Sequence, residues 1–256
     1  MRDIDQTAAP LLDHLVELRK RLIWSFVALF AAFAVCFYFA DRIFAFLAQP
    51  LVAAFPPGEG KLVYTKLYEA FFVEVRVAFF AAFFLAFPII ANQIWAFVAP
   101  GLYSKEKRAF LPFLIATPVL FLTGGALAYY VVMPTAFTFF LGYQGDIGGI
   151  EQQALPSIGE YLSLVMHFIL AFGIAFLLPV LLMLLERAGI VTREQLVRGR
   201  RYAILVAFII AAVATPPDIL SQFMLAVPLI LLYELSLIAI WFTERRRARD
   251  AGKDLV

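Results

Sequence analysis

The chain has a single cysteine, Cys36, and two histidines, His14 and His167, among its 256 residues. One cysteine excludes an internal disulfide framework and a metal site built from several thiolates. We expect Cys36, which lies in an apolar run, to be packed or to face lipid. The histidines are far apart, and the GxSxG, HExxH and GxxxxGK motifs of common enzyme classes are missing. We therefore expect no catalytic residue, metal or cofactor.

Charge is also scarce. Asp, Glu, Lys and Arg make up 16% of the chain, apolar residues make up 63%, and the mean hydropathy is +0.88. A soluble domain of this length needs more polar surface, so the composition predicts a protein of the lipid bilayer. The net charge of +2 is explained by the arrangement of the chain in the membrane, so nucleic acid is not an expected partner.

The basic residues follow an alternating pattern. Of 21 Lys and Arg, 17 lie in the segments 1–21, 99–109, 186–202 and 245–253, whereas the segments between them carry few. Basic connections stay on the cytoplasmic side of a membrane. The pattern therefore predicts that both termini are cytoplasmic.

Long uncharged runs mark the expected membrane-spanning helices, since about 20 apolar residues cross ~30 Å of hydrocarbon. We expect an all-α integral membrane protein with six spans, forming one polytopic membrane domain over residues 1–256. An amphipathic helix at 10–21 precedes the spans, and a basic cytoplasmic tail at 243–256 follows them. The spans are expected at approximately 22–40, 77–98, 110–133, 161–185, 202–214 and 219–242.

The last two spans need a separate argument, because 202–214 has room for a helix of only ~20 Å. Basic residues lie on both sides of the region 202–242, so an even number of crossings must separate them. A hairpin of two short helices satisfies this condition. Thr215, Pro216, Pro217 and Asp218 are expected at its tip, with Asp218 capping the second helix.

Two polar residues interrupt the later spans. His167 is either a proton relay or, more simply, a packed histidine, because it has no obvious acidic partner in the sequence. Glu234 lies well inside the sixth span, where a carboxylate requires a partner or water; a functional role and a structural role remain equally open.

The segment 10–22 reads PLLDHLVELRKRL, with leucines on one helical face and charged residues off it. On its own, this pattern is typical of a juxtamembrane anchor in which Glu17 pairs with Arg21 at i,i+4.

Several motifs carry a resemblance to a known family. They are DHLVELRKRL at 13–22, WAFVAPGLYSKEKR at 95–108, AYYVVMP at 128–134, AFGIAFLLPV at 171–180 and ATPPDILSQ at 214–222. Together they resemble the TatC family, in order and over essentially the whole chain. The resemblance implies the signal-peptide receptor of the twin-arginine translocase, which exports folded proteins across the bacterial inner membrane using the proton-motive force.

The resemblance also implies sites and partners. It places the signal-peptide site at Glu17, Arg19 and Glu106, where carboxylates would bind the arginine pair. It implies an oligomeric complex in which spans five and six receive the single-span proteins TatA and TatB, at Thr215, Asp218 and Gln222. One departure is Leu177, since many members of the family have an acid or amide there.

Two other classes of function remain as alternatives. A secondary transporter of a small solute would need a mid-membrane pocket of polar groups, for which only His167 and Glu234 are candidates. An intramembrane enzyme would need a nucleophile or a metal motif, which the sequence does not offer.

Overall fold

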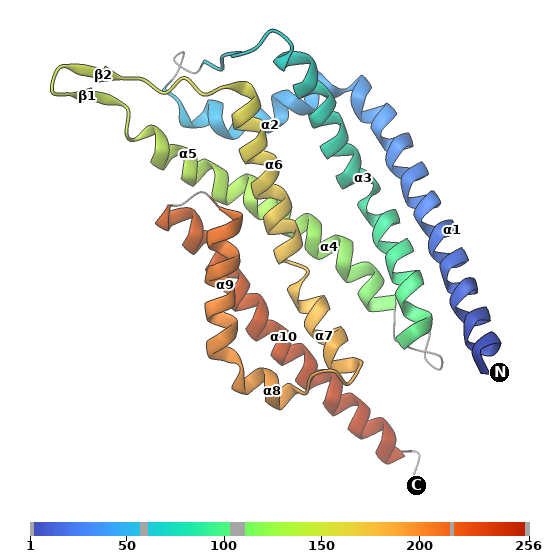
Figure 1. Ribbon diagram of the computed structural model, residues 1–256. Helices are drawn as coiled ribbons and strands as arrows, with labels where there is room; N and C mark the ends of the chain where they lie inside the picture. Colours follow the sequence, from blue (N-terminus) through green and yellow to red (C-terminus); the bar gives the residue numbers. More distant parts are fainter. Residues whose placement is uncertain (1–2, 57–60, 103–110, 216–217, 254–256) are drawn as a thin grey trace. The chain divides into compact units, whose positions relative to one another are not determined.

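The computed structural model describes residues 3–56, 61–102, 111–215 and 218–253, and these residues are almost entirely helical (Figure 1). The prediction of an all-α membrane protein is confirmed to this extent: five helical segments of the described residues are long and apolar enough to cross a membrane. They are His14–Tyr38, Glu69–Phe97, Pro112–Leu141, Ile158–Arg187 and Ile219–Arg245.

The helices are α1 (Asp3–Tyr38), α2 (Ala40–Ala54), α3 (Glu69–Leu102), α4 (Leu111–Leu127), the π-helical turn η2 (Ala128–Val132), α5 (Met133–Leu141), α6 (Ile158–Ala175), α7 (Leu178–Arg187), α8 (Arg193–Arg198), α9 (Arg200–Ala214) and α10 (Ile219–Lys253).

The predicted terminal hairpin needs one correction. Helix α9 is short, with 15 residues, and it is not among the five long apolar segments. Helix α10 is not short, because its apolar part, Ile219–Arg245, has 27 residues and the helix continues to Lys253. Six spans and two cytoplasmic termini stay predictions, as does the single membrane domain.

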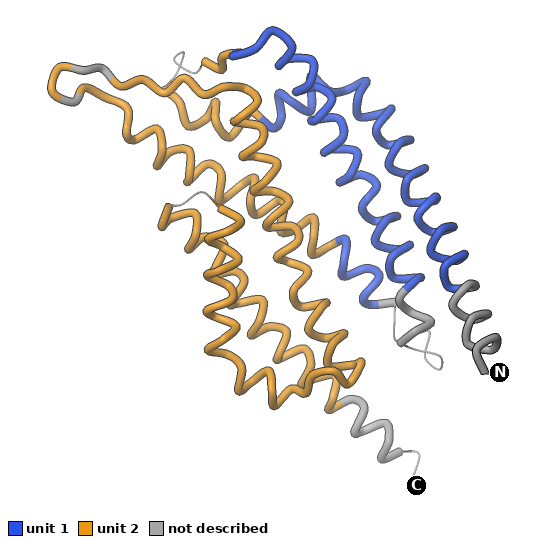
Figure 2. Tube along the Cα trace, in the orientation of Figure 1, with its two compact units in different colours: residues 1–47, 64–118 blue, residues 48–63, 119–256 orange. Residues whose placement is uncertain are grey.

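By its contacts, the chain divides into two compact units, shown in blue and orange in Figure 2. Unit 1 comprises residues 1–47 and 64–118, and unit 2 comprises residues 48–63 and 119–256. Each unit is described by itself below.

In unit 1, α1 and α3 pack side by side along much of their length (Figure 1). Ala78, Ala82 and Ala86 repeat every four residues on α3 and pack with Leu29, Ala32 and Cys36 of α1. Small side chains at this spacing form one stripe and let two helices approach closely. Of the two environments expected for Cys36, packed or facing lipid, the structure shows the packed one.

A buried polar contact joins α3 to α4 in the same unit. Trp95 donates its indole N–H to Thr117 Oγ1 at 2.8 Å, and the Thr117 hydroxyl donates to the carbonyl of Phe113 at 2.7 Å. Both polar groups are therefore satisfied inside an apolar pair of helices.

In unit 2, proline shapes the two long helical segments. Pro134 has no N–H for the preceding turn, and the helix widens there: the N–H of Met133 bonds to the carbonyl of Ala128, five residues back. Similarly, Pro179 near the start of α7 accompanies the break between α6 and α7. Leu177 lies at this break.

The connection from α5 to α6 contains a small β-hairpin that the sequence interpretation did not include. Strand β1 (Gly145–Ile147) pairs antiparallel with β2 (Ile150–Gln152). Gly148 and Gly149 form the two-residue turn with φ of 66° and 90°, a conformation that glycine adopts without a steric penalty.

Helices α4 and α6 of unit 2 come close at two glycines. A Cβ on Gly124 would lie 2.4 Å from the carbonyl oxygen of Phe172, and a Cβ on Gly173 would lie 2.7 Å from the Phe121 ring. Phe121 and Phe172 are fully buried. The absence of side chains at both glycines is therefore what lets these helices pack.

Candidate functional site

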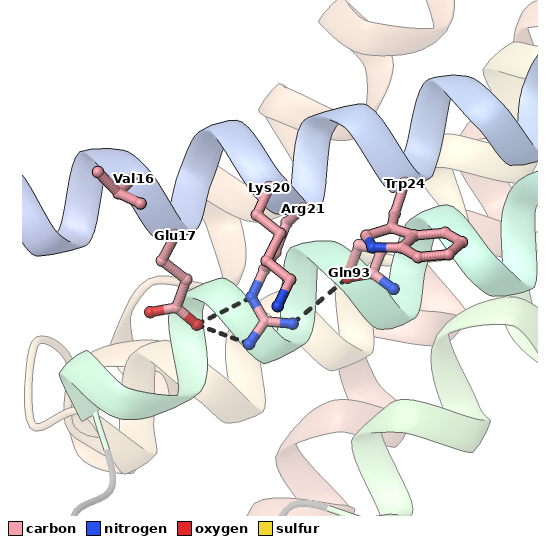
Figure 3. Close-up of a pocket in the computed structure, with 6 residues that line it drawn as sticks. All are labelled: Val16, Glu17, Lys20, Arg21, Trp24 and Gln93. Atoms are coloured by element: carbon pink, nitrogen blue, oxygen red, sulfur yellow. Dashed lines mark hydrogen bonds and ion pairs between the residues drawn. The ribbon is translucent and has the colours of Figure 1, made fainter.

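A pocket lies on one face of α1 at the end of the α1–α3 pair, entirely within unit 1 (Figure 3). Its volume is about 460 Å³. The residues that line it come from successive turns of α1 and from one position of α3. They are Val16, Glu17, Lys20, Arg21, Trp24 and Gln93.

The pocket is built around one carboxylate. Arg21 donates to Glu17 Oε1 from Nη2 at 2.6 Å and from Nε at 2.9 Å. Its remaining nitrogen, Nη1, donates to Oε1 of Gln93 on α3 at 3.3 Å. The predicted i,i+4 pair of Glu17 and Arg21 is thus present, and Figure 3 shows Arg21 reaching from Glu17 to Gln93.

The α1–α3 pair is held together close to this pocket. The ring of His14 stacks on Phe97 with centroids 4.2 Å apart and an angle of 16° between the ring planes. One turn before Phe97 on α3, Gln93 accepts the hydrogen bond from Arg21. The carboxylate of Glu17 is therefore presented from a helix whose position against α3 is fixed at two points.

Solvent reaches the pocket. The side chains of Arg21 and Glu17 are 29% and 34% exposed, and Val16, Lys20 and Trp24 are exposed. The walls combine apolar groups with charges of both signs, so the pocket can hold apolar and charged groups side by side.

The other two residues expected at the receptor site are placed differently. Arg19 is exposed and does not line the pocket, because two residues along a helix turn a side chain about 200° away. Glu106 lies outside the described residues, so its distance from Glu17 is not defined.

The residues expected at the docking site gather at the tip of the α9–α10 hairpin. Asp218 Oδ1 accepts the N–H of Ser221 at 2.7 Å, so Asp218 caps α10 as predicted. The Thr215 hydroxyl donates to the carbonyl of Ala211 at 2.8 Å, and Gln222 Nε2 donates to the carbonyl of Phe208 at 3.3 Å. Gln222 therefore links α10 to α9.

His167 and Thr215, assigned to different roles from the sequence, line one pocket of about 420 Å³ in unit 2. Glu160 and Ser163 of α6 line the same pocket, because positions 160, 163 and 167 lie on one face of a helix. His167 therefore lies two turns from a carboxylate that the sequence interpretation had not connected with it.

Glu234 has a partner. Its Oε2 accepts from Nη2 of Arg200 at 2.8 Å, and the two side chains are 41% and 50% exposed. Next to it, Tyr233 donates its hydroxyl to the carbonyl of Leu196 at 2.7 Å. The pair joins α10 to the start of α9, so Glu234 has the partner that an acid in an apolar helix requires.

Sequence reasoning missed Gln93 and Trp24. A signal for Gln93 was available, since Asn92 and Gln93 interrupt an otherwise apolar run, and a polar side chain in such a run requires a partner. Trp24 lies one turn after Arg21 on the same helical face, but nothing in its spacing separates a pocket wall from a membrane-interface residue.

Comparisons with known proteins address the whole chain. Residues 13–228 match the sequence profile of the family described as Sec-independent protein translocase protein (TatC). The chain belongs to the TatC family. A TatC protein of Magnetococcus marinus is 51% identical to it over 98% of this chain and 91% of the relative. That of Rickettsia prowazekii is 43% identical over 92% and 94%.

Solved TatC structures are also similar. A crystal structure of the twin arginine translocase receptor TatC in DDM has a TM-score of 0.76 and 40% identity, over 88% of this chain and 98% of that chain. The chain is thus a membrane protein of the TatC family of Sec-independent protein translocase components, which is not an enzyme family. No group of metal-ligating side chains occurs among the residues that the structure describes.

Proposed function

We propose that this protein is the receptor and core subunit of a twin-arginine translocase in a bacterial inner membrane. It binds twin-arginine signal peptides of folded cargo proteins on the cytoplasmic face, for export driven by the proton-motive force. The observation that carries the proposal is the pocket at Glu17, a carboxylate that already accepts a two-pronged guanidinium. From the family, we also assign Glu106 and Arg19 to signal-peptide binding.

Geometry explains the preference for arginine. A guanidinium presents several N–H groups in one plane and binds a carboxylate through two of them, whereas an ammonium acts as a point charge. In a partly exposed pocket such as that of Glu17, charge alone discriminates little because solvent screens it. The fork of hydrogen bonds therefore supplies the discrimination.

The first test compares two signal peptides on the purified protein. We expect the twin-arginine peptide to bind about thirtyfold more tightly than the same peptide with two lysines, because two forks are lost and each is worth on the order of 1 kcal/mol. Fluorescence anisotropy at about 0.15 M salt measures both affinities. Equal affinities would contradict the proposal, because they would show attraction by charge alone.

We further propose that the hairpin tip receives the membrane helix of TatA or TatB within an oligomeric complex. Thr215, Asp218 and Gln222 supply polar groups at the end of two packed helices. Exposed apolar side chains of both helices, such as Ile209 and Phe223, continue the surface. A helix from outside can pack on this surface and hydrogen-bond at its polar end. In this arrangement α9 is the fifth span, and both termini are cytoplasmic.

Replacing Gln222 with leucine tests the docking site. We expect crosslinking between the hairpin and TatA or TatB to fall about threefold to fifteenfold, since a hydrogen bond between membrane helices is worth about 0.6–1.7 kcal/mol. Disulfide crosslinking in membranes measures the loss. Gln152→Leu, at an exposed glutamine of the β-hairpin, is the matched control. Crosslinking that Gln222→Leu leaves unchanged would exclude this residue from docking.

A further inference from the structure

The guanidinium of Arg21 occupies the carboxylate to which the proposed function assigns the ligand. All three nitrogens of Arg21 are engaged: Nε and Nη2 contact Glu17 Oε1 at 2.9 and 2.6 Å, and Nη1 contacts Gln93 Oε1 at 3.3 Å. Both bonds to Glu17 end on the same oxygen. This is the arrangement that an arginine of a bound peptide would adopt (Figure 3).

We propose that Arg21 is an internal competitor for the Glu17 carboxylate, so that binding of a signal peptide is an exchange of one guanidinium for another. This inference rests on the proposed function, because it assumes that Glu17 receives the peptide. A single peptide arginine must displace Arg21, so it keeps only part of what it gains from Glu17. The second arginine of the pair displaces nothing and adds its full contribution, which gives a physical reason for a requirement for two.

Arg21 can be displaced because the pair is only partly buried. With 29% and 34% of the two side chains exposed, water can solvate both charges as the pair opens, and such pairs contribute little to stability. The pocket of about 460 Å³ beside them is open to a peptide side chain. An entering guanidinium therefore meets a small energetic barrier from the pair itself.

A displaced Arg21 has two alternative contacts on the pocket wall. Gln93 of α3 already accepts from Nη1 and can keep that bond. Trp24 lines the pocket on the same face of α1, three residues further along, where its ring can stack with a guanidinium. Arg21 thus stays at the edge of the pocket while the peptide occupies the carboxylate.

The competitor lowers the affinity for every peptide that uses Glu17 by the same factor, because the protein bears the cost of opening the pair before the ligand binds. Removing the competitor should therefore strengthen the binding of a twin-arginine peptide and of an arginine–lysine peptide equally. A peptide with two glutamines in place of the arginines does not use Glu17 and should be unaffected.

The test measures the affinity of the full-length purified protein for these three peptides in five variants. We expect Arg21→Gln to raise the affinity for the first two peptides about two- to fivefold, a range set by the small worth of exposed ion pairs. Arg21→Lys keeps the charge but loses the fork, so it should give a smaller gain in the same direction. A gain in Arg21→Lys cannot arise from reduced repulsion of a cationic peptide.

Lys20→Gln, Glu17→Gln and the combination of Glu17→Gln with Arg21→Gln separate the possible explanations. Lys20→Gln removes one positive charge from the same pocket without touching the pair, so its gain should be smaller and should vanish at about 1 M salt. In a Glu17→Gln background, Arg21→Gln should have no effect, because nothing is left to compete for. Monodisperse elution and an unchanged Tm establish that each variant is folded, and Arg21→Lys is the substitution that preserves the most of the native pair.

The outcomes distinguish this inference from the proposed function. If Glu17→Gln weakens binding but neither Arg21→Gln nor Arg21→Lys raises the affinity, Arg21 is not a competitor. The receptor site at Glu17 then still stands. If Glu17→Gln leaves the affinity unchanged, the assignment of the receptor site to Glu17 is wrong. A gain from Arg21→Gln that persists in the Glu17→Gln background would show a general charge effect and would overturn the competitor.

Discussion

Replacing Glu17 with glutamine is expected to weaken the binding of a twin-arginine signal peptide about fivefold to thirtyfold. Hydrogen bonds to a charged group are worth about 1.5–3 kcal/mol, and displacing Arg21 offsets about 0.5–1 kcal/mol of this. The amide of glutamine keeps the shape of the side chain but not its charge. Fluorescence anisotropy with a labelled peptide and the purified protein measures the change.

A matched control removes the same charge elsewhere in unit 1. Glu74→Gln lies near the opposite end of α3 from Gln93 and should change the affinity less than twofold, since screening limits distant charges to about a Debye length. Equal losses in Glu17→Gln and Glu74→Gln would show that the peptide responds only to net charge. The assignment of Glu17 would then fail.

Replacing Gly124 with alanine is expected to destabilise unit 2 by about 2–3 kcal/mol. The new Cβ would lie 2.4 Å from the carbonyl oxygen of Phe172 and 2.9 Å from Cβ of Phe176. The nearest atom belongs to the backbone of α6, so the helices must separate, and overpacking of this kind typically costs 1–3 kcal/mol. A thermal unfolding experiment in detergent should show a Tm lower by about 5–10 °C.

The control for this prediction lies two residues along the same helix. Ala126 is exposed, so Ala126→Val adds more volume than Gly124→Ala at a position without a packed neighbour and should leave the Tm within about 1 °C. An unchanged Tm for Gly124→Ala would mean that the two helices have room to separate, and the close approach would not be essential.

The parts of the fold that follow from long, uniform patterns could be predicted from the sequence. Uncharged runs predicted the five long apolar helices, and Asp218 predicted the cap of α10; Pro216 and Pro217 lie outside the described residues. The β-hairpin was missed because its two strands have three residues each, too few to show the alternation that marks a strand. The sixth span was expected to be short, but α10 continues as a helix through the arginine-rich residues to Lys253, since arginine is a good helix former.

The candidate site could be predicted only where its residues are local in sequence. Glu17 and Arg21 are four residues apart, so helical spacing alone predicts their contact. Gln93 is 72 residues from Arg21, and its role depends on the packing of α3 against α1, which no local pattern encodes. The pairing of Glu234 with Arg200 across 34 residues escaped prediction for the same reason.

Helix α1 runs without a break from Asp3 to Tyr38, and the length of its part from Glu17 onward can be compared with the thickness of a membrane. Glu17 lies 21 residues before Tyr38, which corresponds to about 32 Å along the axis, close to the ~30 Å of a hydrocarbon core. A rigid rod of this length acts as a ruler: if its far end lies at one surface of the bilayer, Glu17 is set at the other. Adding or removing one residue in between would change the depth of the carboxylate by ~1.5 Å and swing it about 100° around the rod.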